Sequence, residues 1–137
     1  MGAVHRRPVL AAALAVLAAT ALSSCSALSG YEEGTWATHA ELAASPKADR
    51  VPSLVAGDAT DIRLREPTYA GGPDLLRWRS AAGVTRADCR ASALKSPAGS
   101  TPSWWPEDAP AEGLRCGWWR VFEHDGAYYA WDHQDGA

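Results

Sequence analysis

Residues 114–133 read LRCGWWRVFEHDGAYYAWDH, and this stretch decides the expected fold. Two runs of alternating side chains flank Asp125-Gly126, and Asp-Gly is the strongest short-range signal for a two-residue hairpin turn. The sequence therefore predicts antiparallel strands over residues 114–124 and 127–133. That turn gives three cross-strand pairs: Phe122 with Tyr129, Arg120 with Trp131, and Trp118 with His133.

Alternation divides the side chains of this hairpin between two faces. The face that we expect in the core carries Cys116, Trp118, Phe122, Tyr129 and Trp131. The opposite face carries Arg115, Trp119, Val121, Glu123, Tyr128 and Asp132. The chain has seven Trp, four Tyr and only one Phe, so indole rings must supply much of the buried apolar surface.

Earlier segments predict the rest of an α+β fold. Residues 61–66 (DIRLRE) and 74–80 (DLLRWRS) both alternate, and the turn residues AGGP at 70–73 join them into a second hairpin. Residues 84–93 have helical spacing, with Thr85 as the N-cap, and residues 95–113, with four prolines, form a long loop. We expect a small antiparallel sheet of about four strands with one packed helix.

The N-terminus has the pattern of a signal peptide. His5-Arg6-Arg7 is basic, and the uncharged run at 9–22 has 14 residues, fewer than the about 20 that a membrane-spanning helix needs. The sequence then reads Leu22-Ser23-Ser24-Cys25. These four residues resemble the lipobox of bacterial lipoproteins, which reads Leu-Ala/Ser-Gly/Ala-Cys.

The resemblance implies cleavage before Cys25 and diacylglycerol on the Cys25 sulfur, which would anchor the protein on the extracytoplasmic face of the cell membrane. Two acyl chains give stable anchoring, at about 0.8 kcal/mol per buried methylene. An ordinary secretory signal with an incidental cysteine is the alternative. The Arg6-Arg7 pair leaves the export route open between the twin-arginine and the general secretory pathways.

The whole chain also resembles small uncharacterised actinobacterial lipoproteins. The shared features are the lipobox, the segments 51–53 and 58–63, the Trp-Trp-Pro loop at 104–106 and the YYAWD stretch at 128–132. That family has no known activity, so the resemblance implies a location and not a reaction.

These signals give three parts: a signal peptide at 1–24, a lipid anchor and tether at 25–50, and one globular domain at 51–137. A capping-box spacing of Thr38 and Glu41 predicts a short helical turn at 38–43 within the tether. Residues 1–24 contain two of the 13 basic residues and no acid, so the mature chain carries 11 basic and 16 acidic residues, a formal charge of −5. Nucleic-acid binding is therefore not expected.

The remaining cysteines, Cys89 and Cys116, are an even pair outside the cytoplasm, which predicts a disulfide. Two free buried cysteines are the alternative. No Cys or His lies at ligand spacing from either one, and His124 and His133 would be ~20 Å apart along the hairpin, so no metal or cofactor is expected. No nucleophile elbow, HExxH, P-loop or GxGxxG motif indicates an enzyme.

Two groups of residues are candidates for a binding surface. Trp104, Trp105, Trp119 and Tyr128 could stack on sugars or contact a partner, but the alternative is that Trp104 and Trp105 fold back over the sheet. Arg63, Arg65, Arg77 and Arg79 could meet anionic lipids or wall polymers. The alternative here is an internal salt-bridge ladder with Asp61, Glu66, Asp74 or the acidic second hairpin.

The functional expectation is a membrane-anchored extracytoplasmic lipoprotein that serves as a binding or interaction module of the cell envelope. Its partners would be the membrane through the N-terminal lipid and an envelope glycan or a membrane protein. A structural adaptor that docks on a membrane protein is the alternative, and an envelope enzyme comes third.

Overall fold

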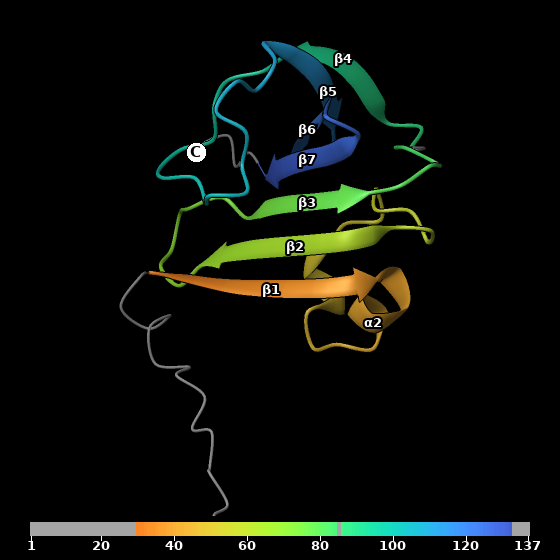
Figure 1. The fold of residues 1–137 in the computed structure, drawn as a ribbon. Helices are drawn as coiled ribbons and strands as arrows, with labels where there is room; N and C mark the ends of the chain where they lie inside the picture. The colour runs from red at the N-terminus through yellow and green to blue at the C-terminus, as the bar shows by residue number, and fades with distance from the viewer. Residues whose placement is uncertain (1–29, 85, 133–137) are drawn as a thin grey trace, which may run out of the picture.

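A computed structural model describes residues 30–84 and 86–132. Within these ranges the chain forms one antiparallel sheet of seven strands in the order β1-β2-β3-β7-β6-β5-β4 (Figure 1). The strands are β1 (Tyr31–Thr38), β2 (Thr60–Pro67), β3 (Leu75–Arg79), β4 (Cys89–Ala93), β5 (Glu112–Cys116), β6 (Trp119–His124) and β7 (Ala127–Asp132). The only helical elements of the described residues are α2 (His39–Ala43) and the 3-10 turn η1 (Ala48–Arg50).

The predicted α+β fold of four strands and one packed helix is therefore wrong, and the protein is a mostly-sheet fold. The expected helix at 84–93 contains β4 instead, which pairs with β5 along its whole length. A short run of small residues such as CRASA fits both periodicities, and pairing with β5 decides for the strand. Thr85, the expected N-cap, lies outside the described residues.

The last predicted hairpin is a three-stranded meander. Phe122 pairs with Tyr129 and Arg120 with Trp131, as the sequence predicts, whereas His133 lies outside the described residues. The expected strand 114–124 is interrupted, because Gly117 and Trp118 form a second tight turn, with Gly117 at φ +62°, and Cys116 pairs with Trp119. This turn moves Cys116 to the face opposite Phe122 and leaves Trp118 exposed.

The N-terminal part of the described chain belongs to the sheet, whereas the sequence analysis places it in a tether. β1 pairs with β2 from Tyr31–Pro67 to Thr38–Thr60, so the folded part begins well before residue 51. The short helix α2 forms where expected, and the backbone N–H of Glu41 donates to Thr38 Oγ1 at 3.2 Å. Residues 1–29, with the lipobox and Cys25, lie outside the described residues.

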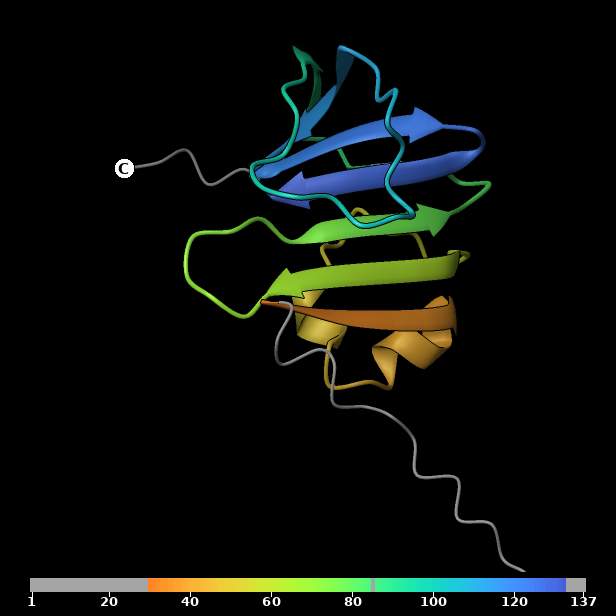
Figure 2. The same ribbon diagram turned by 60° about the vertical axis from the view of Figure 1, so that its left-hand side comes forward.

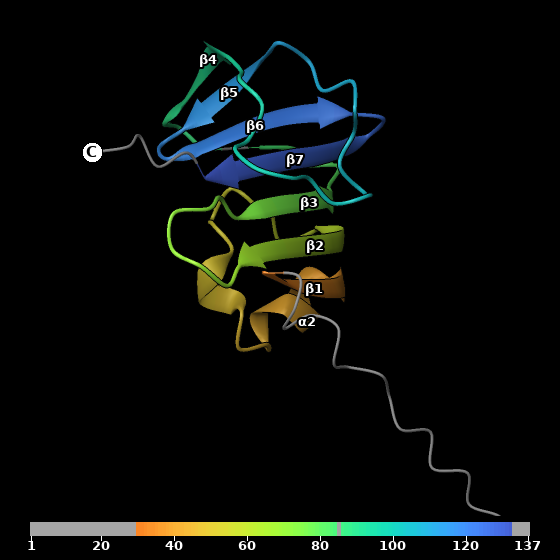
Figure 3. The same cartoon turned by 90° about the vertical axis from the view of Figure 1, so that its left-hand side faces the viewer.

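Apolar side chains cover both faces of the sheet. On the helix face, Leu42, Leu54 and Val55 pack over Ile62, Leu64, Leu76, Trp78, Val121 and Ala130. On the loop face, Trp105 packs with Leu75, Phe122, Tyr129 and Trp131. Figures 2 and 3 show the blue-green segment between β4 and β5 crossing the loop face, with α2 on the other side. Because both faces are covered, three consecutive residues of β7 (Tyr129, Ala130 and Trp131) are buried.

Cys89 and Cys116 form the predicted disulfide, with Cα atoms 4.1 Å apart. They are also direct cross-strand partners, so the bond links edge strand β4 to β5 at one rung of the ladder. A loop with a sequence separation of 27 corresponds to about 3.5 kcal/mol of stabilisation in the chain-entropy model. No helix within the described ranges is long and apolar enough to cross a membrane.

Candidate functional site on the loop face

The long segment 94–111 forms a loop that is held against the sheet by Trp105. This indole is only 6% exposed, and its ring centroid lies 5.6 Å from Phe122, 5.5 Å from Tyr129 and 6.0 Å from Trp131, each in an edge-to-face arrangement. At the base of the loop, the N–H of Leu94 donates to the carbonyl of Ala111 at 2.8 Å. The loop therefore packs on the sheet through Trp105, and a backbone hydrogen bond joins its two ends.

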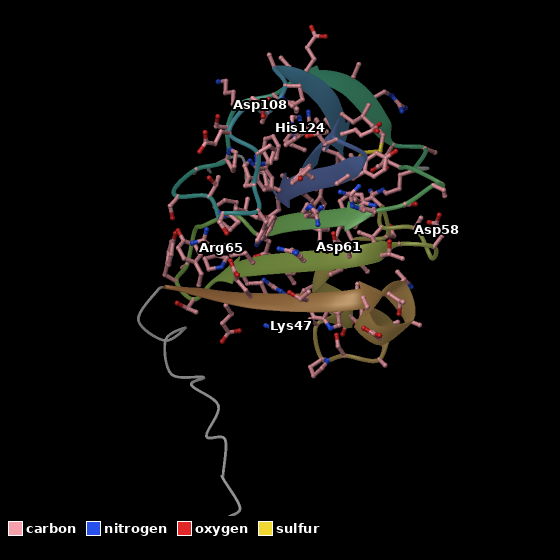
Figure 4. The ribbon with its side chains drawn as sticks, viewed as in Figure 1. Lys47, Asp58, Asp61, Arg65, Asp108 and His124 are labelled. Carbon is pink, nitrogen blue, oxygen red and sulfur yellow. A yellow bond between two sulfur atoms is a disulfide. The ribbon has the colours of Figure 1, made fainter. Side chains whose placement is uncertain are left out.

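Two further contacts fix the loop at its sides. Over β1 and β2, Arg65 Nη1 donates to the carbonyl of Ser100 at 3.3 Å, and the same guanidinium lies 3.6 Å from the ring centre of Tyr31. Near the β6–β7 turn, His124 Nε2 lies 3.4 Å from Asp108 Oδ1 (Figure 4). The loop therefore contacts β1, β2, β6 and β7.

A groove lies between this loop and the sheet. One hollow of about 460 Å³ is lined by Trp105, Phe122 and Trp131, with Lys95, Ser96 and Glu107 among its polar residues. A second hollow of about 240 Å³ is lined by Ser92, Ala93, Lys95, Ser96, Arg120 and Trp131. The two hollows share Lys95, Ser96 and Trp131, so they adjoin each other at these residues, and we call the pair the groove.

The four candidate aromatic residues do not form one surface. Trp105 covers the sheet as the fold-back alternative expects, and Trp104 is half-buried against it with ring centroids 6.1 Å apart. Trp119 and Tyr128 lie on the opposite, helix face, where Tyr128 stacks on Trp78 at 5.5 Å. The large aromatic side chain that does project is Trp118, at 66% exposure, which the sequence analysis places in the core.

The candidate arginine quartet takes part in internal ion pairs. Asp61 contacts Arg77 and also lies 3.4 Å from Arg63 and 3.7 Å from Arg79 (Figure 4). Burial opposes ionisation of Asp61, but the hydrogen bond and charge of Arg77, helped by Arg63, hold the pKa of Asp61 below its ordinary value. Arg65 pairs with Glu33 at 3.9 Å. Three of the four arginines thus gather around Asp61, as the ladder alternative expects, while Arg65 pairs with Glu33 of β1, which that alternative does not name.

Two other acids named for that ladder, Glu66 and Asp74, lie in a separate charge cluster. Glu66 contacts Lys47 and accepts from Arg50 Nε at 2.7 Å, while Arg50 Nη2 donates to Asp74 at 3.1 Å. Burial, with the nearby charge of Asp132, raises the pKa of Asp74 to about 6. Burial opposes ionisation of Glu66 too, but hydrogen bonds from Lys47 and Arg50 outweigh it and lower its pKa. This cluster fastens η1 to β2 and to the start of β3.

The sequence analysis misses a second arginine group on the loop face. The pairing of Cys89 with Cys116 puts the next residues, Arg90 and Arg115, opposite each other. The Gly117-Trp118 turn then puts Arg115 opposite Arg120. The sequence does contain a signal for this group, because an arginine lies beside each cysteine of the expected disulfide. That signal predicts paired arginines only if residues 89–93 are assigned as a strand.

Within the described ranges, no group of three or more His, Cys, Asp or Glu side chains is arranged to hold a metal ion. What the loop face offers is a shaped groove with cationic and hydroxyl groups along it. Comparison of the chain with protein-family models, with curated proteins and with solved structures gave no match.

Proposed function

We propose that the protein is a lipid-anchored binding module of the cell envelope that holds an extended polar ligand in the groove on its loop face. The observation that carries the proposal is the pair of adjoining hollows, about 460 and 240 Å³, beside a loop that is itself fastened to the sheet. Ligand sites in proteins have volumes of roughly 300–1,000 Å³ and are largely formed before the ligand binds.

The residues of the groove favour a glycan over an apolar ligand. Trp105, Phe122 and Trp131 line its inner wall, whereas Lys95, Ser96, Thr101 and Glu107 supply charged and hydroxyl groups. These three rings are at most 6% exposed, so the polar groups, which are able to pair with sugar hydroxyls, supply most of the open surface of the groove. Two adjoining hollows suit a ligand of several sugar units better than a single compact molecule.

The membrane location rests on the lipobox. Six peptide units separate Cys25 from Tyr31, the first residue of β1, and a fully extended chain covers at most about 3.6 Å per residue. The sheet would therefore begin within about 22 Å of a lipidated Cys25. A domain held at this distance meets the membrane-proximal layer of the envelope.

Trp118 favours the adaptor as a second candidate function. Its indole is 66% exposed at the β5–β6 turn, and aromatic residues of this size are common anchors in protein interfaces. A membrane protein that covers this turn would bury the ring.

A thermal-shift screen with fragments of cell-wall glycan tests the proposed function. Ser96 lines both hollows, so Ser96→Trp would fill the groove and abolish the ligand-induced rise in Tm. Ser103→Trp, in the same loop and also exposed, is the control that should retain the shift. An equal shift in both variants would show that the groove is not the binding site.

The anchor and the adaptor need separate measurements. Labelling of cells with a palmitate analogue should mark the wild-type protein and not Cys25→Ala; label in neither or in both would refute lipidation of Cys25. Co-purification of a membrane protein by the wild type and not by Trp118→Ala, without any glycan shift, would favour the adaptor.

A further inference from the structure

Three arginines from neighbouring strands form a row across the loop face. Arg90 of β4, Arg115 of β5 and Arg120 of β6 are direct cross-strand partners, and Arg120 is in turn opposite Trp131 of β7. Adjacent strands are about 4.8 Å apart, so the row spans about 10 Å. Arg90 and Arg115 are exposed and Arg120 is half-buried.

No member of this arginine row forms an ion pair among the described residues, although the hydrogen bond and charge of Arg86, and after them the charge of Arg90, lower the pKa of Asp88. The cations of the ion pairs found there are Lys47, Arg50, Arg63, Arg65, Arg77, Arg79, Arg86 and, when protonated, His124. Arg90 Nη1 donates to the carbonyls of Ala87 and Cys89, and Arg115 Nε lies 3.4 Å from the carbonyl of Gly117. Backbone oxygens hold these two side chains without neutralising them.

Like charges directly opposite each other on a sheet destabilise it. The same molecule shows the usual remedy, since Asp61 lies among Arg63, Arg77 and Arg79. The arginine row lacks that remedy. Every other arginine in the described ranges takes part in an ion pair, so this row indicates that its compensating anion comes from outside.

The smaller hollow of the groove adjoins this row and has matching chemistry. Its lining includes Arg120 and Lys95 as cations and Ser92 and Ser96 as hydroxyl donors, and it contains no carboxylate. Guanidinium groups bind phosphate or carboxylate oxygens through two parallel N–H donors, and hydroxyl and ammonium groups add further bonds. The hollow and the row therefore provide one anion-binding strip.

We propose that this strip binds a polyanionic envelope polymer in which phosphate or carboxylate groups repeat along the chain. This inference rests on the proposed function and specifies the ligand class of the same groove. Repeating anionic groups match cations that repeat across three strands. The row lies on the β4 side of the sheet, four to six strand spacings or about 19–29 Å from β1, which leads to Cys25. A wall polymer is therefore the better occupant than the lipid headgroups at the anchor.

The test measures binding of the full-length protein in detergent to linear polyphosphate and to polygalacturonate, which separate phosphate from carboxylate. Neutral dextran and anionic phospholipid vesicles are the comparison ligands. In Arg115→Gln/Arg120→Gln the affinity for the polyanion should fall at least tenfold. The control is Arg63→Gln/Arg79→Gln, which removes the same charge from partly exposed arginines of the same face and should change affinity less than threefold.

Several results would overturn the inference. Equal losses in the two double variants would show a general charge effect, and tighter binding to the vesicles than to either polymer would favour the membrane. Binding of neutral glycan without polyanion binding would refute the polyanion while the proposed function stands, and binding of none of these polymers would refute both. If the double variant unfolds, the single exposed change Arg115→Glu replaces it and must weaken binding more than Arg115→Lys.

Discussion

Replacement of Trp105 tests whether the long loop is part of the core. The side chain is only 6% exposed and contacts three other aromatic rings edge to face. A buried Trp removes roughly 150–250 Å² from water, or about 4–6 kcal/mol at ~25 cal/mol per Å², and large-to-small changes at such sites cost about 3–5 kcal/mol. We therefore expect Trp105→Ala to lower the unfolding free energy by about 3–5 kcal/mol.

Urea unfolding followed by far-ultraviolet circular dichroism measures this change without depending on tryptophan fluorescence. Trp104→Ala is the matched control, because Trp104 is its sequence neighbour and is only half-buried; it should cost about 1 kcal/mol. A loss below about 1 kcal/mol for Trp105→Ala, or one no larger than that of the control, would refute the interpretation that this loop stabilises the sheet.

Three further changes probe the backbone and the two charge clusters. A Cβ on Gly113 would lie 2.3 Å from the carbonyl oxygen of Val121, so Gly113→Ala should lower the unfolding free energy in urea by more than about 2 kcal/mol. Gly57 lies in open space, so the control Gly57→Ala should change the unfolding free energy by less than about 0.5 kcal/mol. Similar values for the two variants would contradict the steric argument. Burial raises the pKa of Asp74 from 3.8 to about 6, so its native-state proton stabilises the fold at low pH. The unfolding free energy of the wild type relative to Asp74→Asn should therefore fall by about 2 kcal/mol between pH 4 and pH 6, and parallel pH profiles would refute the shift. Asp61→Asn leaves the arginines around it without their carboxylate and should lower the unfolding free energy by about 1–3 kcal/mol, which an unchanged Tm would contradict.

The features that follow from local chemistry were predictable from the sequence. Asp125-Gly126 sets a turn through its own backbone preference, and both residues have positive φ in the structure. The cap at Thr38 and the hairpin of β2 and β3 depend on residues that are close in sequence. The disulfide was predictable because only Cys89 and Cys116 remain once Cys25 is assigned to the lipid.

The features that depend on distant partners were not predictable. β1 reads YEEGTWAT, without a clear apolar alternation, because it is an edge strand that needs only β2 beside it. β4 is shorter, with five residues and no large apolar side chain, and its pairing with β5 follows an intervening segment of 18 residues. The Gly117-Trp118 turn did carry a signal, since Gly-X is one of the two-residue hairpin sequences, but the alternation on either side concealed it.

The candidate site was partly predictable for the same reason. The arginine quartet could be placed on one face from the alternation of β2 and β3, and its acid Asp61 was a sequence neighbour. To predict the arginine row from the sequence, the segments of β4, β5 and β6 must all be assigned as strands. One wrong assignment, that of β4 as a helix, was enough to miss it. Trp118 is exposed because it lies in the missed turn. Trp119 keeps its predicted side with Val121 and Tyr128 but is half-buried, because both faces of the sheet are covered.

The bond between Cys89 and Cys116 fixes more than stability. Without it, β4 would be held only by main-chain pairing to β5, and a slip of one residue would turn Arg90 to the other side of the sheet. The disulfide prevents that change of register, so it keeps Arg90 and Arg115 opposite each other. In a reducing compartment the central strands would fold, but the spacing between Arg90 and Arg115 would not be fixed. The arginine row would therefore be complete only after the disulfide forms.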